Sequence, residues 1–396
     1  MKEKVLIIGA GYAGSVVANK LAREFRKKIA RDELEITILD RDDTSINQGG
    51  FTFLPFGLYT PEDIVRKRRK LISPRVNTAF GDAGEVTSID LNSKEVGVKS
   101  GKRYNYDYLV IAMGARADAD AVPGLADELN TFYTSIEGAT QVGEKIRSMD
   151  KGDIVVSVAA MPIPCPGAPV KFTFLLDSYL RNVLKNREQF NLTLLWPMEP
   201  IGPPEFNKLV SGLLKEKNIE VKRSFPLGQV DAAKKELSSK EGETVNYDLL
   251  IAVPPHKPQK VLSDSGITDE KGWVPCDRTT LQYRGPAGNH DNVYILGDNG
   301  PADILKTGIG AHYQALVVSQ NLINDIYGNN TKAPYEGETG CPIITEMETP
   351  SSAGQAYIAT WNYGVMPAPF KPTKMGWYMY RMYYYLHWDM SVKGLF

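Results

Sequence analysis

The chain opens with an apolar run, residues 5–8, that leads directly into three closely spaced glycines, Gly9, Gly11 and Gly14. This order predicts a strand, a tight turn and a helix, which we expect to extend from about Ser15 to Lys27. Gly9 permits the turn, Gly11 lets the backbone approach a pyrophosphate, and Gly14 allows the helix to pack closely on the strand. The segment therefore predicts a dinucleotide-binding unit of a parallel α/β fold.

A second apolar run, residues 34–39, ends at Asp40. In a dinucleotide-binding unit, an acidic residue at this point accepts hydrogen bonds from the ribose of the adenosine. The predicted cofactor contacts in this part of the chain are therefore Gly9, Gly11, Tyr12, Ala13, Gly14, Asp40 and Arg41.

Two later segments favour FAD over NAD as the dinucleotide. Residues 106–115 predict a strand that ends in a turn of small residues, with Ala112 and Gly114 at the ligand. Residues 292–298 predict another strand, whose terminal Gly297 and Asp298 can reach a ribityl chain. The alternative is that both segments are buried strands followed by ordinary turns.

Cys165 lies where a second glycine-rich nucleotide turn is expected. A strand-like run at residues 154–158 precedes this proline-framed cysteine, and residues 170–176 predict a helix. Between Ile154 and Pro169 the only glycine is Gly167, so a second pyrophosphate would lack its cradle, which argues against NAD(P)H as the electron donor. A cysteine just ahead of a helix N-terminus favours its thiolate form, because the helix dipole stabilises negative charge there.

Together these segments resemble the flavoproteins with two dinucleotide-binding domains, a group that includes disulfide reductases, type II NADH dehydrogenases, sulfide:quinone oxidoreductases and flavocytochrome c sulfide dehydrogenases. The resemblance covers most of the chain and implies bound FAD, with Asp298 on its ribityl group. It also implies that Lys306, Thr307 and Gly308 lie under the isoalloxazine, where a cation and helix-start N–H groups stabilise an anionic reduced flavin. A solvated lysine ahead of a helix is the alternative for Lys306.

Within this group, the segment around Cys165 is similar to that of sulfide:quinone oxidoreductases and flavocytochrome c sulfide dehydrogenases. Disulfide reductases and type II NADH dehydrogenases keep the glycine turn at this place. The similarity implies a redox pair of Cys165 and Cys341, which follows the helix after Lys306. The alternative for Cys165 and for Cys341 is a free buried thiol. We interpret Cys276 as a structural residue.

Two features depart from the pattern of these enzymes. Many sulfide:quinone oxidoreductases have a third essential cysteine before the one that matches Cys165, and here no cysteine precedes it. In the haem-partnered relatives a glutamate commonly follows the first cysteine by six residues, and here Lys171 holds that position. The change removes an acid–base candidate and adds a cation able to hold a thiolate.

The C-terminal segment 375–390 is unusually rich in methionine, tyrosine and tryptophan. At helical spacing it predicts one apolar seam of Met375, Met379, Met382, Leu386 and Met390. This composition suits the headgroup zone of a bilayer, and the alternative is a domain or homo-oligomer interface. In the resembling quinone reductases a C-terminal helical region sits on the membrane and shapes the quinone entrance, and Phe51, Phe53 and Phe56 match a loop of that pocket.

The sequence thus predicts an α/β fold of two Rossmann-like dinucleotide-binding domains, disulfide-reductase-like, followed by a membrane-interacting region. The FAD-binding domain comprises residues 1–118 and 268–335. A second Rossmann-like domain without an NAD site interrupts it at 119–267, and a quinone and membrane region follows at 336–396.

The resemblance implies a sulfide:quinone oxidoreductase that converts sulfide to sulfur or polysulfide and reduces a membrane quinone. The alternatives are a flavoprotein sulfide dehydrogenase that passes electrons to a separate cytochrome, or a type II NADH:quinone dehydrogenase-like enzyme. A net charge of −1 does not favour nucleic acid, and the histidines show no metal-ligand spacing with the cysteines, so no metal is expected. Without a signal peptide or an apolar run of about 20 residues, we expect a peripheral membrane protein on the cytoplasmic side.

Overall fold

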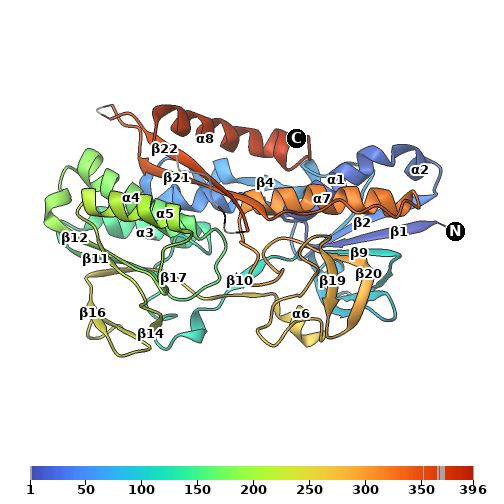
Figure 1. Cartoon of the computed structure of the whole chain (residues 1–396), viewed down its shortest axis with the longest axis horizontal. Coiled ribbons are helices and arrows are strands. Elements are labelled where there is room, and N and C mark those ends of the chain that lie inside the picture. The colour runs from blue at the N-terminus through green and yellow to red at the C-terminus, as the bar shows by residue number, and fades with distance from the viewer. Residues whose placement is uncertain (1, 351, 364, 366–370, 396) are drawn as a thin grey trace.

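The computed structural model describes residues 2–350, 352–363, 365 and 371–395. Two α/β lobes lie side by side along the long axis of the molecule, and each is built on its own parallel sheet (Figure 1). The predicted α/β architecture of two Rossmann-like units is therefore confirmed.

The first lobe is built on a six-stranded sheet in the order β19-β20-β9-β1-β2-β5. All neighbours are parallel except the edge strand β19, which runs antiparallel to β20. The strands are β1 (Glu3–Ile8), β2 (Leu34–Asp40), β5 (Asn77–Phe80), β9 (Tyr108–Ile111), β19 (Gln282–Gly285) and β20 (Gly288–Ile295). The apolar run of β1 is buried because helices and a small antiparallel sheet cover the two faces of a parallel sheet of this kind.

The helix after the glycine turn has the predicted length but begins and ends about three residues earlier than the sequence predicts. Helix α1 spans Tyr12–Glu24, and a separate short helix α2 spans Arg26–Ala30. The break is at Phe25, whose buried ring packs against Tyr327 at 5.1 Å between ring centroids. Helix α7 (Gly308–Ile326) packs beside α1 on the same lobe.

The second lobe has a four-stranded parallel sheet in the order β13-β12-β11-β17. Its strands are β11 (Gly152–Val158), β12 (Phe190–Leu195), β13 (Glu220–Lys222) and β17 (Leu249–Val253), and its helices are α3 (Ile136–Ser148), α4 (Gly167–Tyr179) and α5 (Pro204–Glu216). Helix α4 confirms the helix predicted after Cys165. Every residue of α4 is buried, which marks it as a helix covered on all sides.

Short antiparallel elements complete both lobes and join them. One three-stranded sheet belongs to each lobe, and the pair β10–β18 lies at the crossing between them. The first lobe has the sheet of β6 (Val86–Asp90), β7 (Glu95–Val98) and β8 (Arg103–Asn105), and the second has β14 (Leu227–Asp231), β15 (Glu236–Ser239) and β16 (Thr244–Asn246). The two-stranded pairs are β10 (Ala115–Ala117) with β18 (His256–Pro258) and β3 (Thr44–Ile46) with β4 (Val65–Lys67). A short helix, α6, spans Lys260–Asp264.

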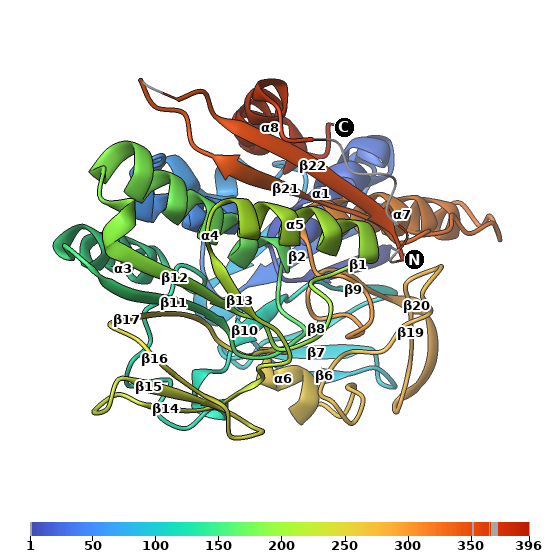
Figure 2. The same ribbon diagram turned by 60° about the vertical axis from the view of Figure 1, so that its left-hand side comes forward.

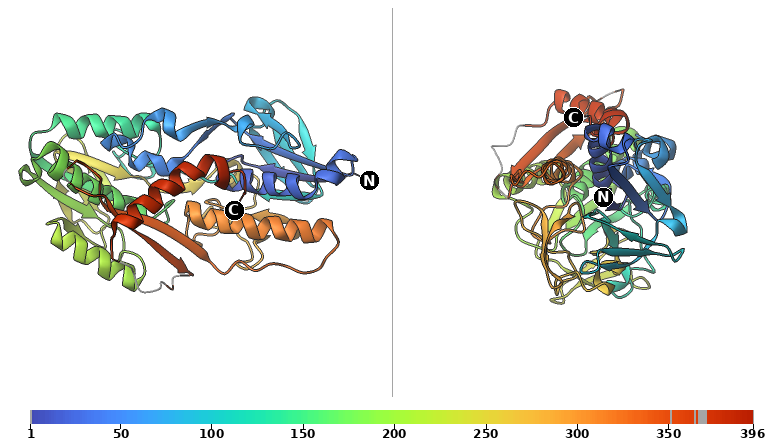
Figure 3. Two further views of the ribbon diagram at one scale, coloured as in Figure 1. Left: turned by 90° about the horizontal axis from the view of Figure 1, so that it is seen from above. Right: turned by 90° about the vertical axis from the view of Figure 1, so that its right-hand side faces the viewer.

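The C-terminal region covers the second lobe and reaches back to the first. Strands β21 (Glu338–Glu346) and β22 (Gln355–Asn362) form an antiparallel hairpin that runs along α4 (Figure 2). Helix α8 (Lys374–Leu386) packs on β22 and lies across the middle of the molecule, over both lobes (Figure 3). None of the helices described here is both long and apolar enough to cross a bilayer.

Candidate active site

The turn between β1 and α1 has the shape that its three glycines predict. Gly9 has a φ of +100°, and a Cβ on it would collide with the carbonyl oxygen of Ala112. A Cβ on Gly14 would collide with the carbonyl oxygen of Gly9, so α1 packs directly on the turn. No atom lies within 4 Å of the Cβ position of Gly11, which leaves the space that an approaching phosphate needs.

Other glycines of the predicted cofactor site also face open space. The Cβ positions of Gly114 and Gly308 have no atom within 4 Å, and that of Gly297 meets only the Cβ of Ala13, at 4.0 Å. Burial raises the pKa of the neighbouring Asp298 carboxyl group, and no described residue donates a hydrogen bond to it. A half-buried carboxyl group without a protein donor fits the hydroxyl groups of a ribityl chain, so the residues present fit a flavin dinucleotide.

Asp40 lies at the end of β2, as predicted, and contacts the glycine turn. Its Oδ2 accepts a hydrogen bond from the backbone N–H of Ala10 at 2.7 Å. The carboxylate also forms an ion pair with Arg68. The side chain of Arg41, the next residue along the chain, is exposed and is not part of this cluster.

Lys306, Thr307 and Gly308 form the start of α7. Thr307 is the N-cap, and its Oγ1 accepts a hydrogen bond from the N–H of Gly310 at 2.8 Å. The Lys306 ammonium donates to the carbonyl oxygens of Gly300 and Pro301 at 3.0 and 3.1 Å. Burial lowers the pKa of Lys306 to about 8. The cation is therefore held in place beside the positive end of a helix, rather than free in solvent.

Cys165 and Cys341 lie together although 176 positions separate them in the chain. Their Sγ atoms are 3.1 Å apart. Cys165 precedes α4 at the carboxyl-terminal end of the β11 strand, and Cys341 lies in the middle of β21. The predicted pair is thus brought within reach of disulfide chemistry, since a small approach of the two sulfur atoms would join them. Cys276 is not part of the pair, and burial raises its pKa to about 12.

Gly167 makes room for the two sulfur atoms. A Cβ on Gly167 would lie 2.5 Å from the Sγ of Cys341 and 2.9 Å from a methyl carbon of Ile343. Only glycine therefore lets the start of α4 approach β21 this closely.

The backbone of Cys165 is held in an unusual conformation. Its φ is +49°, in the left-handed region that residues with a side chain rarely adopt. The hydroxyl group of the half-buried Tyr133 donates to the carbonyl oxygens of Pro164 and Cys165, the latter at 3.0 Å. Such strain persists only where surrounding contacts enforce it, which is typical of functional sites.

The two thiols differ in acidity. A hydrogen bond from the Cys341 thiol, aided by the charge of Lys171 and the N–H of Ala168, lowers the pKa of Cys165 to about 7. The same hydrogen bond, together with burial, raises the pKa of Cys341 well above its ordinary value. In the reduced pair the negative charge therefore resides on Cys165 and the remaining proton on Cys341.

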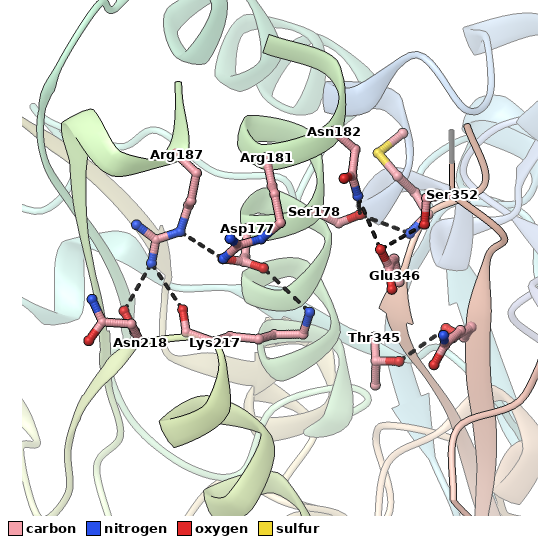
Figure 4. A network of polar contacts seen from close by, with 12 residues as sticks. Asp177, Ser178, Arg181, Asn182, Arg187, Lys217, Asn218, Thr345, Glu346 and Ser352 are labelled. Atoms are coloured by element: carbon pink, nitrogen blue, oxygen red, sulfur yellow. Dashed lines mark hydrogen bonds and ion pairs between the residues drawn. The ribbon is translucent and has the colours of Figure 1, made fainter. Parts of the chain in front are cut away.

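A buried ionic network anchors the far end of α4 (Figure 4). The Asp177 carboxylate is fully buried and accepts hydrogen bonds from Arg187 at 2.7 Å and Arg181 at 3.0 Å, with Lys217 at 3.4 Å. Arg187 also donates to the carbonyl oxygen of Phe190 at 2.7 Å. A buried carboxylate is tolerated here because several cations and their hydrogen bonds replace its water.

The next contacts along α4 reach the strand that carries Cys341. The Nδ2 of Asn182 donates to the Oε1 of Glu346 at 3.2 Å, and the N–H of Met347 donates to the Oγ of Ser178 at 3.1 Å (Figure 4). Helix α4 and β21 are thus tied at one end by polar contacts and at the other by the packing of Gly167 on Cys341.

The phenylalanines after β2 pack under α8 and against α4. The Phe53 ring stacks on Tyr380 at 5.5 Å, and Tyr59 stacks on Tyr384 at 3.8 Å. Phe56 packs against Phe172 of α4, and Phe51 is buried in the same core. An aromatic layer therefore joins this segment to the inner face of α8.

The outer face of α8 carries much of the predicted methionine seam. The exposed large side chains of this helix are Met375, Tyr378, Met379, Met382 and Tyr385. Leu386 and Met390, the other predicted members, are partly buried. The inner face instead presents Trp377, Tyr380 and Tyr384 to the core.

Two residues that shape the site did not stand out in the sequence. Gly167 is visible as a glycine at a helix start, but its role depends on where Cys341 lies. Tyr133 has no local signal, because its hydroxyl group reaches Cys165 across a long stretch of chain.

Comparisons with known proteins agree with this arrangement. Residues 3–156 match the pyridine nucleotide-disulphide oxidoreductase family. The chain is 28% identical to the mitochondrial sulfide:quinone oxidoreductase of Dictyostelium discoideum, over 99% of this chain and 86% of that protein. It is 23% identical to the mitochondrial sulfide:quinone oxidoreductase of Mus musculus, over 99% and 86%. The fold matches that of the sulfide:quinone oxidoreductase from Aquifex aeolicus with a TM-score of 0.82 and 21% identity, covering 99% of this chain and 92% of that one.

Proposed function

The chain belongs to the flavoprotein family that contains the sulfide:quinone oxidoreductases, and we propose that it oxidises hydrosulfide at Cys165 and Cys341 and reduces a membrane quinone. The observation that carries this proposal is the 3.1 Å separation of the two sulfur atoms. It is supported by the lowered pKa of Cys165, which suits a leaving group in thiol–disulfide exchange.

The proposed cofactor is FAD. The residues suited to hold it are those of the open glycine turns, together with Asp40 at the adenosine end and Asp298 at the ribityl chain. When bound, FAD would supply the two-electron carrier between the cysteine pair and the quinone. The start of α7 places a helix N-terminus and the Lys306 cation where they would stabilise negative charge.

The cysteines perform the sulfur chemistry. In the oxidised pair, hydrosulfide attacks the Sγ of Cys341, the S–S bond to Cys165 breaks, and its electron pair stays on Cys165 as a thiolate. The products are a persulfide on Cys341 and a thiolate on Cys165, so atoms and charge balance. We propose this direction because Cys165 lies just ahead of the N-terminus of α4, which stabilises a leaving thiolate there.

The aromatic layer under α8 is the proposed quinone side. The rings of Phe53, Tyr59, Tyr380 and Tyr384 stack in two pairs, and this aromatic layer would form the apolar wall beside a quinone ring. The exposed methionines and tyrosines of α8 suit the membrane interface, from which a lipid-soluble quinone enters. The protein is therefore proposed to bind a membrane surface peripherally, on the cytoplasmic side, through this face.

The test is an anaerobic titration of the purified flavoprotein with sulfide and, separately, with NADH, followed by flavin absorbance. We expect sulfide to bleach the flavin and NADH to have no effect, because residues 159–166 contain no glycine that would form an NAD cradle. Cys165→Ser and Cys341→Ser should abolish the sulfide response, while Cys276→Ser should retain it. Bleaching by NADH alone, or an undiminished response in Cys165→Ser, contradicts the proposal.

A further inference from the structure

Lys171 is a buried lysine near the cysteine pair that takes no part in the bond-breaking step described above. Its side chain is only 3% exposed, and it lies in the first half of the fully buried helix α4. A lysine is almost never buried to this extent without a negative charge or another compensating partner, because moving an ammonium group out of water is costly. The groups around Lys171 therefore indicate which negative charge its ammonium group stabilises.

The position of Lys171 on α4 directs it toward the two sulfur atoms. Gly167 faces the Sγ of Cys341, and Lys171 follows Gly167 by one helical turn on the same face. Side chains of a helix tilt toward its N-terminus, so the Lys171 side chain extends back over the turn that touches Cys341. Its charge accordingly acts on both Cys165 and Cys341.

Two aromatic rings hold the ammonium from the other side. The Nζ of Lys171 lies 5.6 Å from the ring centroid of Phe53 and 5.6 Å from that of Tyr380. These two rings stack on each other, so they offer a joint π surface to the cation. An aromatic surface attracts a cation without neutralising it, which leaves the positive charge available to an anion.

We propose that Lys171 is the fixed counter-charge of the cysteine pair: a positioning residue that stabilises a negative charge on the two sulfur atoms and is itself held by the rings of Phe53 and Tyr380. The inference rests on the proposed function and adds one residue to it. Because Tyr380 belongs to α8, the helix proposed to face the membrane also contributes to the charge balance at the sulfur atoms.

Other ionisable groups near the pair do not supply this charge. Asp298 acts in the opposite direction and disfavours the thiolate. The other side chains whose pKa is raised by the charge of these cysteines are neutral phenols. Tyr133 and Tyr380 are affected by both cysteines, and Tyr357 by Cys341. Among the described residues, Lys171 is the one cation that lowers the pKa of both cysteines.

The test measures the thiolate itself and not turnover. The holoenzyme is reduced anaerobically with a dithiol and freed of it, then exposed to iodoacetamide at a series of pH values, and alkylation of Cys165 is followed by mass spectrometry. In the wild type, the rate should rise through a midpoint near pH 7. Lys171→Met removes the charge with little change of volume and should move the midpoint up by about one pH unit, which lowers the rate at pH 7 about fivefold.

Three variants complete the design. Lys171→Arg keeps the charge and should restore the wild-type midpoint. Tyr380→Leu removes one ring and should give an intermediate shift, which also tests the idea if Lys171→Met does not fold. Lys215→Met, at an exposed position on α5, is the matched control and should leave the profile unchanged.

The inference is overturned if the alkylation midpoint of Lys171→Met equals that of the wild type. If Lys171→Met does not fold, the same result in Tyr380→Leu overturns it. This result is independent of sulfide oxidation. If the wild type does not oxidise sulfide but Lys171→Met still shifts the alkylation midpoint, the proposed function fails and the role of Lys171 stands.

Discussion

The backbone N–H of Cys165 donates a hydrogen bond to the carbonyl oxygen of Lys306. One residue belongs to the turn ahead of α4 in the second lobe, and the other to the segment that leads into α7 in the first lobe. Together with the bond from Tyr133 to the Cys165 carbonyl, it fixes the backbone of Cys165 on both sides. The sulfur site is therefore attached directly to the segment proposed to carry the flavin.

The close approach of α4 and β21 predicts a strong effect of one methyl group. In Gly167→Ala, the new Cβ would lie 2.5 Å from the Cys341 Sγ, so β21 or the start of α4 must move and the sulfur atoms separate. We expect sulfide-dependent quinone reduction to fall at least about tenfold, as is common when reacting groups are displaced by a fraction of an ångström. Thiol titration should also show slower formation of the disulfide.

Gly212→Ala is the control for this substitution. Gly212 lies within α5, and no atom lies within 4 Å of its Cβ position. Alanine there should stabilise the protein by about 0.5–1 kcal/mol and leave activity unchanged. If Gly167→Ala behaves like Gly212→Ala, the packing of Gly167 on Cys341 has no functional role.

The ionic network around Asp177 predicts a large loss of stability in Asp177→Asn. The amide leaves Arg187 and Lys217 buried without their counter-charge, which we expect to lower the free energy of unfolding by about 3–5 kcal/mol. Urea denaturation provides the measurement. Asp264→Asn, which breaks an exposed pair with Lys260, should change stability by less than about 0.5 kcal/mol, and equal effects of the two variants would contradict this account.

Stability should fall in mild acid because of His387. Burial lowers its pKa to about 4 from an ordinary value of 6.5, so the unfolded chain binds a proton there before the folded protein does. With respect to this group, the free energy of unfolding is therefore highest above pH 6.5. It decreases as the pH falls from 6.5 toward 4, by on the order of 3 kcal/mol.

His387→Phe keeps a ring beside Tyr12, which stacks on His387 at 5.2 Å, but cannot be protonated. Denaturation curves across this range should show a shallower pH dependence for the variant, with the difference from the wild type confined to acid. Parallel curves for the two proteins would show that His387 does not control acid stability.

The exposed methionines of α8 predict how the protein meets a lipid bilayer. A double change, Met379→Glu with Met382→Glu, removes apolar contact worth about 1.5 kcal/mol per side chain and adds charge, so binding to vesicles should weaken at least about 100-fold. Sedimentation with vesicles measures this. Met198→Glu, at another exposed methionine, should bind like the wild type, and vesicle binding that survives in the double variant would instead favour α8 as an interface between copies of the chain.

Local sequence patterns were sufficient for the nucleotide-binding part of the protein. Short-range rules predict the glycines of the first turn, the strand ending at Asp40, and the strand that ends at Ile295 just before Asp298. These rules work because a tight turn or a close backbone approach restricts the residue at that position. The same rules placed the first helix about three residues too late and missed the break at Phe25, because helix ends depend on capping and packing as well as on propensity.

The amino-acid sequence by itself indicated the main strands, the glycine turn and the helix after Cys165, because those depend on neighbours in the chain. Only the tertiary structure decided that Cys341 meets Cys165, that Gly167 admits its sulfur, that Tyr133 holds the Cys165 carbonyl, and that Lys171 lies under Phe53 and Tyr380. It also decided which face of α8 is exposed. Such contacts join residues far apart in the chain, and their geometry follows from how β21 and α8 pack on α4 and the two lobes, which no local pattern encodes.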